Sequence, residues 1–401
     1  MNNFFHKSRH VLLMAAMMMG TAVTAYAQID KLPHPDTTSG NFFGVAVSID
    51  GARALVGASS EDTCDTNAGA AYIFEHDAAA NRWEEVAQLM PDDCLGGLFF
   101  GRSVSLSGDR ALVAAANEFF AANRSNAAYV FERDSTGVWN QTAKLTIDSE
   151  EEEGPFGASV SLDGKRALVT TWGDTSDGRF GGAAYIFERN AETGRWTKTA
   201  RLTGSGGLRA GIFGGAAALD GDRAVVSASS YFRDSPGSIY IFERDADGHW
   251  NEAAHFGDID DFFISIDLEE DRVLVGESKD GRRKAGAATL YARNPDGTWR
   301  LASTLRPPTP YDHGGFGSEV SLAGNRALVA GYDEQLRLDY NIDRVVYVYA
   351  YDAETNAWTY RNIVDIGKVA FGTAVDLDGM VALIGDASES EPGAAYVVRL
   401  R

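Results

Sequence analysis

The chain has 401 residues, of which 44% are hydrophobic and 23% are charged, and its formal net charge is −21. This is the composition of a globular protein and not of a disordered or collagen-like chain. The acidic balance excludes a protein that binds nucleic acid through phosphate contacts. The length and the two cysteines exclude a small disulfide-stapled scaffold.

The first 27 residues have the pattern of a secretory signal peptide. Lys7 and Arg9 precede an apolar run at residues 11–19, and small residues follow before Gln28. A membrane anchor is the alternative, but the apolar run is shorter than the roughly 20 residues that span a bilayer. We therefore expect cleavage before Gln28, no membrane insertion, and a protein that is secreted or periplasmic.

Seven copies of one unit follow, and each begins at a phenylalanine that is usually followed by glycine. Neighbouring copies start 49 to 57 residues apart, and a tryptophan near the end of the unit is present in six copies. The seven units start near Phe43, Phe100, Phe156, Phe213, Phe262, Phe316 and Phe371.

Each unit contains four short runs that are rich in Val, Ile, Tyr and Phe and alternate with period two. In the second unit they occupy residues 103–106, 111–114, 128–132 and 140–145. The first two runs are usually joined by Asp-Gly or a similar pair, which is the signal of a tight hairpin. The pattern predicts an all-β protein in which residues 28–401 form one seven-bladed β-propeller of four-stranded antiparallel blades.

The two ends of the chain complete one blade in this prediction. The last unit, from Phe371, stops after its third strand, whereas residues 28–32 align with the fourth strand at residues 142–145. We therefore expect the N-terminal strand to complete the last blade and close the ring, since closure removes unpaired sheet edges.

In this form the chain resembles the FG-GAP repeat, in particular its bacterial secreted form, and more distantly the propeller of integrin α subunits. The resemblance rests on the Phe-Gly openings, on the segment Arg-Ala-Leu-Val-Gly-Ala at residues 53–58, and on the tryptophan-led last strand, and it covers residues 28–401. It implies a ligand-binding or adhesion module without catalysis, in which calcium often adds rigidity.

Calcium is not carried over to this chain. The calcium-binding members have an Asp-rich loop between the first two strands, where this chain has a two-residue turn. Such a turn is too short to surround a cation that takes 6–8 oxygen ligands. We therefore expect neither a metal nor another cofactor.

The binding surface is expected on the face that carries the loops from strand 2 to strand 3 and from strand 4 to the next blade. These loops are long and differ between units, which is typical of binding loops on a rigid scaffold. Aromatic rings beside carboxylates suit the stacking and hydrogen bonding of sugars, or a cationic partner. The alternative is that these rings only fill their own loops. The candidate ligand-binding residues are Trp172, Asp174, Asp177, Tyr231, Phe232, Asp234, Tyr311, Asp312, Tyr332 and Asp333.

Cys64 and Cys94 fall on this same face, in a 2–3 loop and the adjacent 4–1 loop. In an oxidising compartment a disulfide between them is expected, with two free thiols or metal ligation as the alternatives.

Arg53 and Glu75 lie on neighbouring strands, and Arg110 with Glu132 repeats the arrangement. Because the arrangement occurs in four units, we interpret it as structural cross-strand pairing and not as a catalytic pair.

The sequence contains no His-Glu-x-x-His, no Gly-x-Ser-x-Gly and no phosphate-binding loop. We therefore expect a monomeric, non-catalytic module for cell adhesion or carbohydrate binding, which recognises an extracellular glycan or protein through its long-loop face. The first alternative is a glycan-cleaving hydrolase or lyase with carboxylates at the tunnel mouth. The second is a scaffold that docks a partner subunit through an apolar patch.

Overall fold

The structure, a computed structural model, contains seven four-stranded sheets. In every sheet, hydrogen-bonded neighbours run antiparallel, and the described residues contain no helix. Accordingly, the described part of the chain has no helix long and apolar enough to cross a membrane. The described residues are 28–34, 39–116, 126–147, 156–172, 181–205, 211–230, 237–259, 264–278, 285–310, 314–332, 344–368, 370–388 and 391–400.

The sheets follow one another along the chain as blades 1 to 7. Blade 1 contains β2 (Phe43–Asp50), β3 (Arg53–Ala58), β4 (Ala70–Asp77) and β5 (Arg82–Leu89), and blade 2 contains β6 (Phe100–Ser107), β7 (Arg110–Ala115), β8 (Ala127–Arg133) and β9 (Trp139–Leu145). Blade 3 contains β10 (Phe156–Asp163), β11 (Arg166–Thr171), β12 (Ala183–Arg189) and β13 (Trp196–Leu202), and blade 4 contains β14 (Gly211–Asp220), β15 (Arg223–Ser230), β16 (Gly237–Arg244) and β17 (Trp250–Ile259). Blade 5 contains β18 (Ile264–Glu269), β19 (Arg272–Glu277), β20 (Ala287–Arg293) and β21 (Trp299–Leu305), and blade 6 contains β22 (Val320–Ala323), β23 (Arg326–Tyr332), β24 (Arg344–Asp352) and β25 (Ala357–Val364). Blade 7 contains β26 (Phe371–Asp378), β27 (Val381–Asp386), β28 (Ala394–Arg399) and β1 (Gln28–Lys31).

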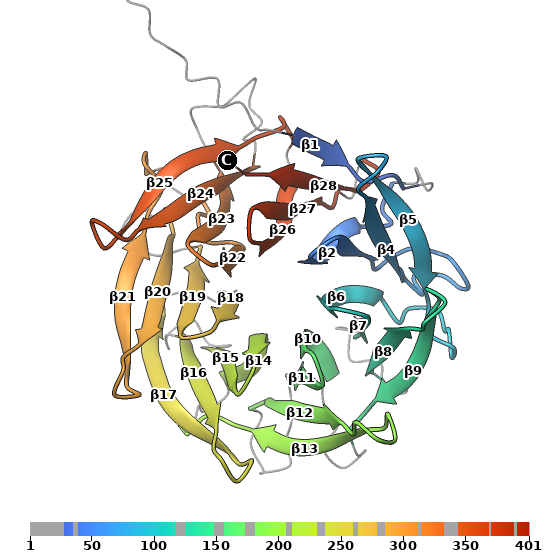
Figure 1. Cartoon of the computed structure of the whole chain (residues 1–401), viewed down its shortest axis with the longest axis horizontal. Coiled ribbons are helices and arrows are strands. Elements are labelled where there is room, and N and C mark those ends of the chain that lie inside the picture. Colours follow the sequence, from blue (N-terminus) through green and yellow to red (C-terminus); the bar gives the residue numbers. More distant parts are fainter. Residues whose placement is uncertain are drawn as a thin grey trace, which may run out of the picture.

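The blades stand around a central channel (Figure 1). The first strand of each blade faces the channel and the fourth strand forms the rim, so the predicted seven-bladed propeller is confirmed.

The N-terminal strand closes the ring as predicted. β1 pairs antiparallel with β28, with Gln28 opposite Arg399 and Lys31 opposite Tyr396. The next residue, Leu32, donates its backbone N–H to the carbonyl of Ala395 at 2.9 Å. Blade 7 therefore combines strands from both ends of the described chain, and the pairing of β1 with β28 closes the ring.

The Phe-Gly pair is required by the close approach of neighbouring blades. Phe43 is fully buried, and its ring meets those of Tyr72 and Phe74 edge-on at 5.8 and 6.2 Å. Gly44 has a φ of 91°, and a Cβ there would lie 2.3 Å from the carbonyl oxygen of Ala394 in blade 7. Glycine is therefore required at this position both by the positive φ and by the close contact between blades.

Ion pairs connect some of the blades near the short-turn face. The predicted pairs within blades are present, with Arg53 to Glu75 at 2.8 Å and Arg110 to Glu132 at 3.3 Å. Each glutamate of this kind also contacts an arginine of the next blade, as Glu132 contacts Arg189 at 2.6 Å. We call these inter-blade contacts the outer clamp, which consists of Glu75–Arg133, Glu132–Arg189, Glu188–Arg244 and Glu243–Arg293.

Candidate functional site

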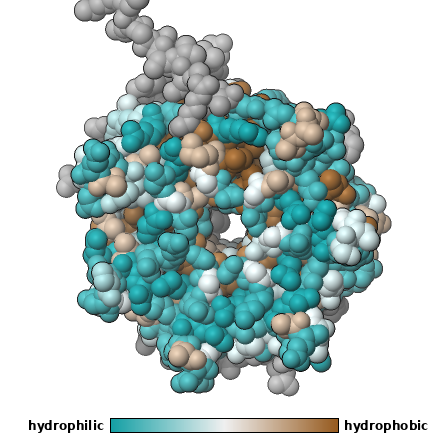
Figure 2. All heavy atoms as spheres, viewed as in Figure 1, coloured by the Kyte–Doolittle hydropathy of each residue, from teal (hydrophilic) through white to brown (hydrophobic). Residues whose placement is uncertain are grey.

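A cavity of about 410 Å³ lies in the central channel, which Figure 2 shows as a hole through the disc. Residues of all seven inner strands or the segments just before them line it, together with Trp172 after β11 and Ser229 near the end of β15. Because these residues belong to the starts of first strands and the ends of second strands, the cavity lies in the half of the channel nearest the long loops.

Serine side chains join the inner strands of neighbouring blades. The channel-facing edge of each inner strand has no partner strand, so its N–H groups need other acceptors. The backbone N–H of Leu106 donates to Ser48 Oγ at 3.1 Å, and Leu162 and Leu219 donate in the same way to serines of the preceding blades. These serines therefore supply acceptors for backbone N–H groups on the inner edge of the next blade.

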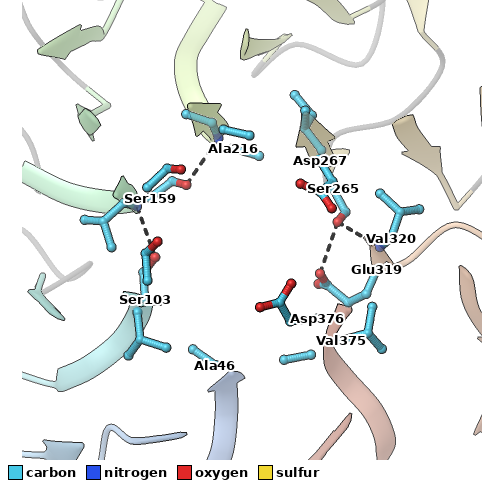
Figure 3. A pocket seen from close by; sticks show the side chains of 18 of the residues that line it. Ala46, Ser103, Ser159, Ala216, Ser265, Asp267, Glu319, Val320, Val375 and Asp376 are labelled. Atoms are coloured by element: carbon cyan, nitrogen blue, oxygen red, sulfur yellow. Dashed lines mark hydrogen bonds between the residues drawn. The ribbon is translucent and has the colours of Figure 1, made fainter. Parts of the chain in front are cut away.

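Three carboxyl groups interrupt this pattern in blades 5, 6 and 7. Asp267 and Asp376 stand where Ser48 stands in blade 1, and Glu319 stands two residues before the corresponding position in blade 6. Figure 3 shows the carboxyl groups of Glu319 and Asp376 pointing into the cavity. We call Asp267, Glu319 and Asp376 the acidic sector.

Asp267 and Asp376 accept the inter-blade hydrogen bonds that serines accept elsewhere. The N–H of Leu322 donates to Asp267 Oδ2 at 2.7 Å, and the N–H of Ile49 donates to Asp376 Oδ2 at 2.7 Å. Ser321 lies between the two carboxyl groups, with its Oγ 3.1 Å from Asp267 Oδ2 and 3.3 Å from Asp376 Oδ1. A single hydroxyl therefore bridges both acids.

Glu319 is held differently. Ser265 donates its hydroxyl to Glu319 Oε2 at 3.1 Å and accepts the backbone N–H of Val320 at 3.1 Å. These contacts fix one carboxyl oxygen of Glu319 at the wall of the cavity (Figure 3).

The surroundings of the acidic sector favour protonated carboxyl groups. The three side chains keep some exposure to the channel but lie deep inside the molecule. Burial and then the charge of Asp376 raise the pKa of Asp267 to about 7. Burial raises the pKa of Glu319 to about 7 against the opposing charge of Arg344, and it also raises the pKa of Asp376. The channel therefore holds carboxyl groups that can exchange protons near neutral pH.

Of the ten ligand-binding candidates from the sequence, two lie within the described residues. Trp172 lines the cavity, whereas Tyr332 packs its ring 5.5 Å from the guanidinium carbon of Arg344, and a binding role for either residue stays a prediction. Asp174, Asp177, Tyr231, Phe232, Asp234, Tyr311, Asp312 and Asp333 lie outside the described residues.

Sequence reasoning missed the acidic sector, although a signal for it was present. The two alternate positions of each inner strand that line the cavity hold Ser or Ala in blades 1 to 4, so Asp267, Glu319 and Asp376 are departures from the repeat. The three acids can be grouped into one site only when these positions are known to face one channel.

Cys64 and Cys94 form a disulfide bond with their Cα atoms 6.4 Å apart. The bond joins the β3–β4 loop to the β5–β6 connection on the long-loop face. The N–H of Gly97 also donates to the carbonyl of Thr66 at 2.7 Å. The disulfide and this hydrogen bond thus join the two loops.

A group of potential metal ligands lies in the exposed turn between β16 and β17. One ligand atom each of Asp245, Asp247 and His249 lies within 4.8 Å of the others. Asp245 Oδ1 already accepts the backbone N–H groups of Asp247 and His249 at 3.0 and 2.8 Å. The arrangement is that of a side-chain-stabilised turn.

Comparison with known proteins supports the repeat and the fold. The model of the FG-GAP repeat matches residues 26–74, 83–131, 139–187 and 196–242. No curated protein matches the chain significantly. Each matched segment runs from a fourth strand to the third strand of the next blade, the same offset by which β1 closes the ring.

Solved structures are similar in fold at low sequence identity. The WD40 repeats of RRP9 match with a TM-score of 0.57 and 11% identity over 94% of this chain and 98% of that one. A protein from Lactobacillus plantarum matches with a TM-score of 0.50 and 13% identity over 83% and 88% of the two chains. The Pseudomonas aeruginosa periplasmic gluconolactonase PpgL matches with a TM-score of 0.48 and 14% identity over 80% and 85%. Likeness at this level of identity concerns the fold alone. Four segments between residues 26 and 242 are thus similar to the FG-GAP repeat, and they lie within a seven-bladed β-propeller.

Proposed function

We propose that this protein is an exported, monomeric, non-catalytic recognition module that binds the end of an extracellular glycan in its channel cavity. One observation carries the proposal, namely that Trp172 and the carboxyl groups of the acidic sector line the same cavity. In the order of the ring, blade 3, which carries Trp172, lies opposite blades 6 and 7. A ligand between them would meet an indole on one side and hydrogen-bonding oxygens on the other.

The lining matches the chemistry of a sugar. An aromatic face packs against the C–H surface of a sugar ring, and hydroxyl and carboxyl oxygens bond its hydroxyl groups. Serines of the inner strands and the carboxyl group of Glu319 supply such oxygens. The volume lies at the lower end of the range of roughly 300–1,000 Å³ that is usual for small-molecule sites. The cavity thus suits a glycan terminus better than a broad protein surface.

Export is proposed from the sequence of residues 1–27. N-terminal sequencing of the protein recovered from the periplasm or the medium tests the proposal. An N-terminus at Gln28 would support it, and a full-length N-terminus on a cytoplasmic protein would contradict it.

A glycan-cleaving enzyme is the second candidate, and the raised pKa of Glu319 favours it because a general acid must hold its proton near neutral pH. Such an enzyme also needs a second carboxylate that is free to act as base or nucleophile. Asp267 and Asp376 instead receive backbone N–H groups on both of their oxygens. This engagement is why we place binding first.

A glycan array tests the proposed binding. The probes are the wild type, Trp172→Ala and, as a matched control, Leu301→Ala, which removes an exposed side chain of the rim strand β21. We expect a defined set of glycans to bind the wild type and the control, with at least a tenfold loss for Trp172→Ala, since tenfold corresponds to about 1.4 kcal/mol.

A blank array, or equal binding by Trp172→Ala, would contradict the glycan proposal. Shortened products after incubation of the wild type with a bound glycan would favour the enzyme instead.

A further inference from the structure

The junctions between blades are not built alike. The outer clamp spans the junctions from 1–2 to 4–5. At the position of the clamp glutamate, blades 5, 6 and 7 hold Ala292, Ala350 and Arg399. Arg399 meets His76 of blade 1 at 3.2 Å, which is not a pair of opposite charges. The junctions 5–6, 6–7 and 7–1 therefore lack this clamp.

The acidic sector lies at these same three junctions. Asp267 of blade 5 accepts the N–H of Leu322 in blade 6, and Asp376 of blade 7 accepts the N–H of Ile49 in blade 1. Ser321 of blade 6 contacts both carboxyl groups. In this part of the ring, the inner edge is held by carboxyl groups where other blades use serine.

Ser321 has one hydroxyl hydrogen and two carboxyl neighbours. A serine hydroxyl has one hydrogen and can donate it to one carboxyl group only. If both acids were ionised, Ser321 Oγ would turn a lone pair toward the second carboxylate, and two negative charges would face one hydroxyl. If one acid holds a proton, it donates to Ser321 Oγ, and Ser321 donates to the other acid. Both contacts of Ser321 Oγ with the two carboxyl groups are then hydrogen bonds.

We propose that Asp267 and Asp376 share one proton through Ser321, and that blades 5 to 7 form a sector of the ring whose junctions weaken when this proton is lost. The proton would complete the link from blade 5 through blade 6 to blade 7. Its loss would replace one hydrogen bond of that link by repulsion.

The charged groups around the pair do not offset a second negative charge. Within the cavity lining, Glu319 adds a further acid and Arg102 is the basic residue. Arg344 of β24 acts on Glu319 and donates to Ser318 Oγ and to the carbonyl of Gly372.

Toward the short-turn face, the next positions of the flanking inner strands are acidic as well. They hold Asp50, Asp220, Glu269 and Asp378. The charge that acts most strongly on Asp267 is that of Asp376, and it raises the pKa of Asp267 further after burial has raised it.

The sign of the effect on stability follows from proton binding. A carboxyl group whose pKa is higher in the folded than in the unfolded chain binds its proton more tightly when folded. The contribution of such a group to stability is complete below the ordinary carboxyl range and is lost as the pH rises toward about 7. One shared proton corresponds to a folding equilibrium constant that falls up to tenfold per pH unit in this window.

The test uses the residues that other blades hold at the same positions. Glu319→Ser, with Ser103 and Ser159 as natural counterparts, removes the independent carboxyl group, so that Asp267 and Asp376 remain. Adding Asp267→Ser and Asp376→Ser, with Ser48 as counterpart, removes the pair. Urea unfolding from pH 5 to pH 9 gives the folding equilibrium constant of each protein.

We expect the folding equilibrium constant of the Glu319→Ser protein to fall up to tenfold per pH unit as the pH rises toward about 7. The folding equilibrium constant of the triple variant should not change over the same range. A flat profile for Glu319→Ser, or an unchanged slope for the triple variant, would overturn the proposal. If the triple variant does not fold, infrared spectra of the Glu319→Ser protein decide the question. The carbonyl band of a protonated carboxylic acid at pH 6 that disappears by pH 9 supports the shared proton, and its absence at pH 6 overturns it.

Discussion

Leu32→Ala is the sharpest test of ring closure by the N-terminal strand. Leu32 is 1% exposed and lies in the apolar cluster between blades 7 and 1, together with Phe43, Tyr72 and Val397. Truncation of a buried leucine to alanine removes its apolar contacts and leaves a cavity, and the two effects together cost about 2–5 kcal/mol. We therefore expect the free energy of unfolding to fall by about this amount if β1 is docked in the native ring.

A matched control exists inside the same chain. Leu145 occupies the equivalent position at the end of β9, eleven residues before the next Phe-Gly, and is 3% exposed. Guanidinium unfolding of residues 28–401 compares both variants with the wild type. Similar losses for Leu32→Ala and Leu145→Ala would show that the terminal strand contributes as much as an internal one. An unchanged midpoint for Leu32→Ala beside a lowered midpoint for Leu145→Ala would refute closure by β1.

Three further predictions concern the contacts between blades and loops. Gly57→Ala should destabilise the protein strongly, because its Cβ would lie 1.8 Å from the backbone oxygen of Gly101, and a thermal melt that remains at the wild-type temperature would contradict this. Cys64→Ser should lower the free energy of unfolding by about 3–4 kcal/mol, as loop closure over 30 residues implies, measured by denaturant titration with and without reductant. Glu132→Gln should reduce the loss of stability in acid. Burial opposes ionisation of this carboxyl group, but hydrogen bonds and the charge of Arg189 outweigh it and lower its pKa, so its contribution is present at neutral pH and lost as the pH falls below the ordinary glutamate range. Urea unfolding at pH 3 to 7 measures this, and parallel profiles for both proteins would contradict it.

The ring could be predicted from the sequence because the repeat carries its own geometry. Phe43 and its counterparts fill the gaps between blades, and the following glycines permit the close backbone contacts. Leu32 precedes a Phe-Gly pair by eleven residues, as Leu145 does at the end of a fourth strand, and this spacing predicted the place of β1 in the ring. These features follow from local chemistry that recurs in most of the units.

The acidic sector could not be predicted in the same way. Asp267 and Asp376 are more than a hundred residues apart, and nothing local indicates that one serine bridges them. The site forms only in the assembled ring. Alternate residues of every inner strand face the common channel, and the serine and aspartate side chains among them accept backbone N–H groups of the next blade. Trp172 was predicted as a binding residue because it breaks the tryptophan pattern, whereas three acids in an acidic chain did not stand out.

Comparison of the repeats with one another shows that blades 1 to 4 differ from blades 5 to 7. Blades 1 to 4 carry the clamp glutamates and have Ser or Ala at the channel, and the four FG-GAP matches end at residue 242, within blade 4. Blades 5 to 7 lack those glutamates and hold the three carboxyl groups. Since a buried acid costs more than a buried serine at an equivalent position, structural need alone does not account for Asp267 and Asp376. These departures from the repeat all lie in blades 5 to 7 and face one cavity. We therefore expect the ligand of this protein to bind there.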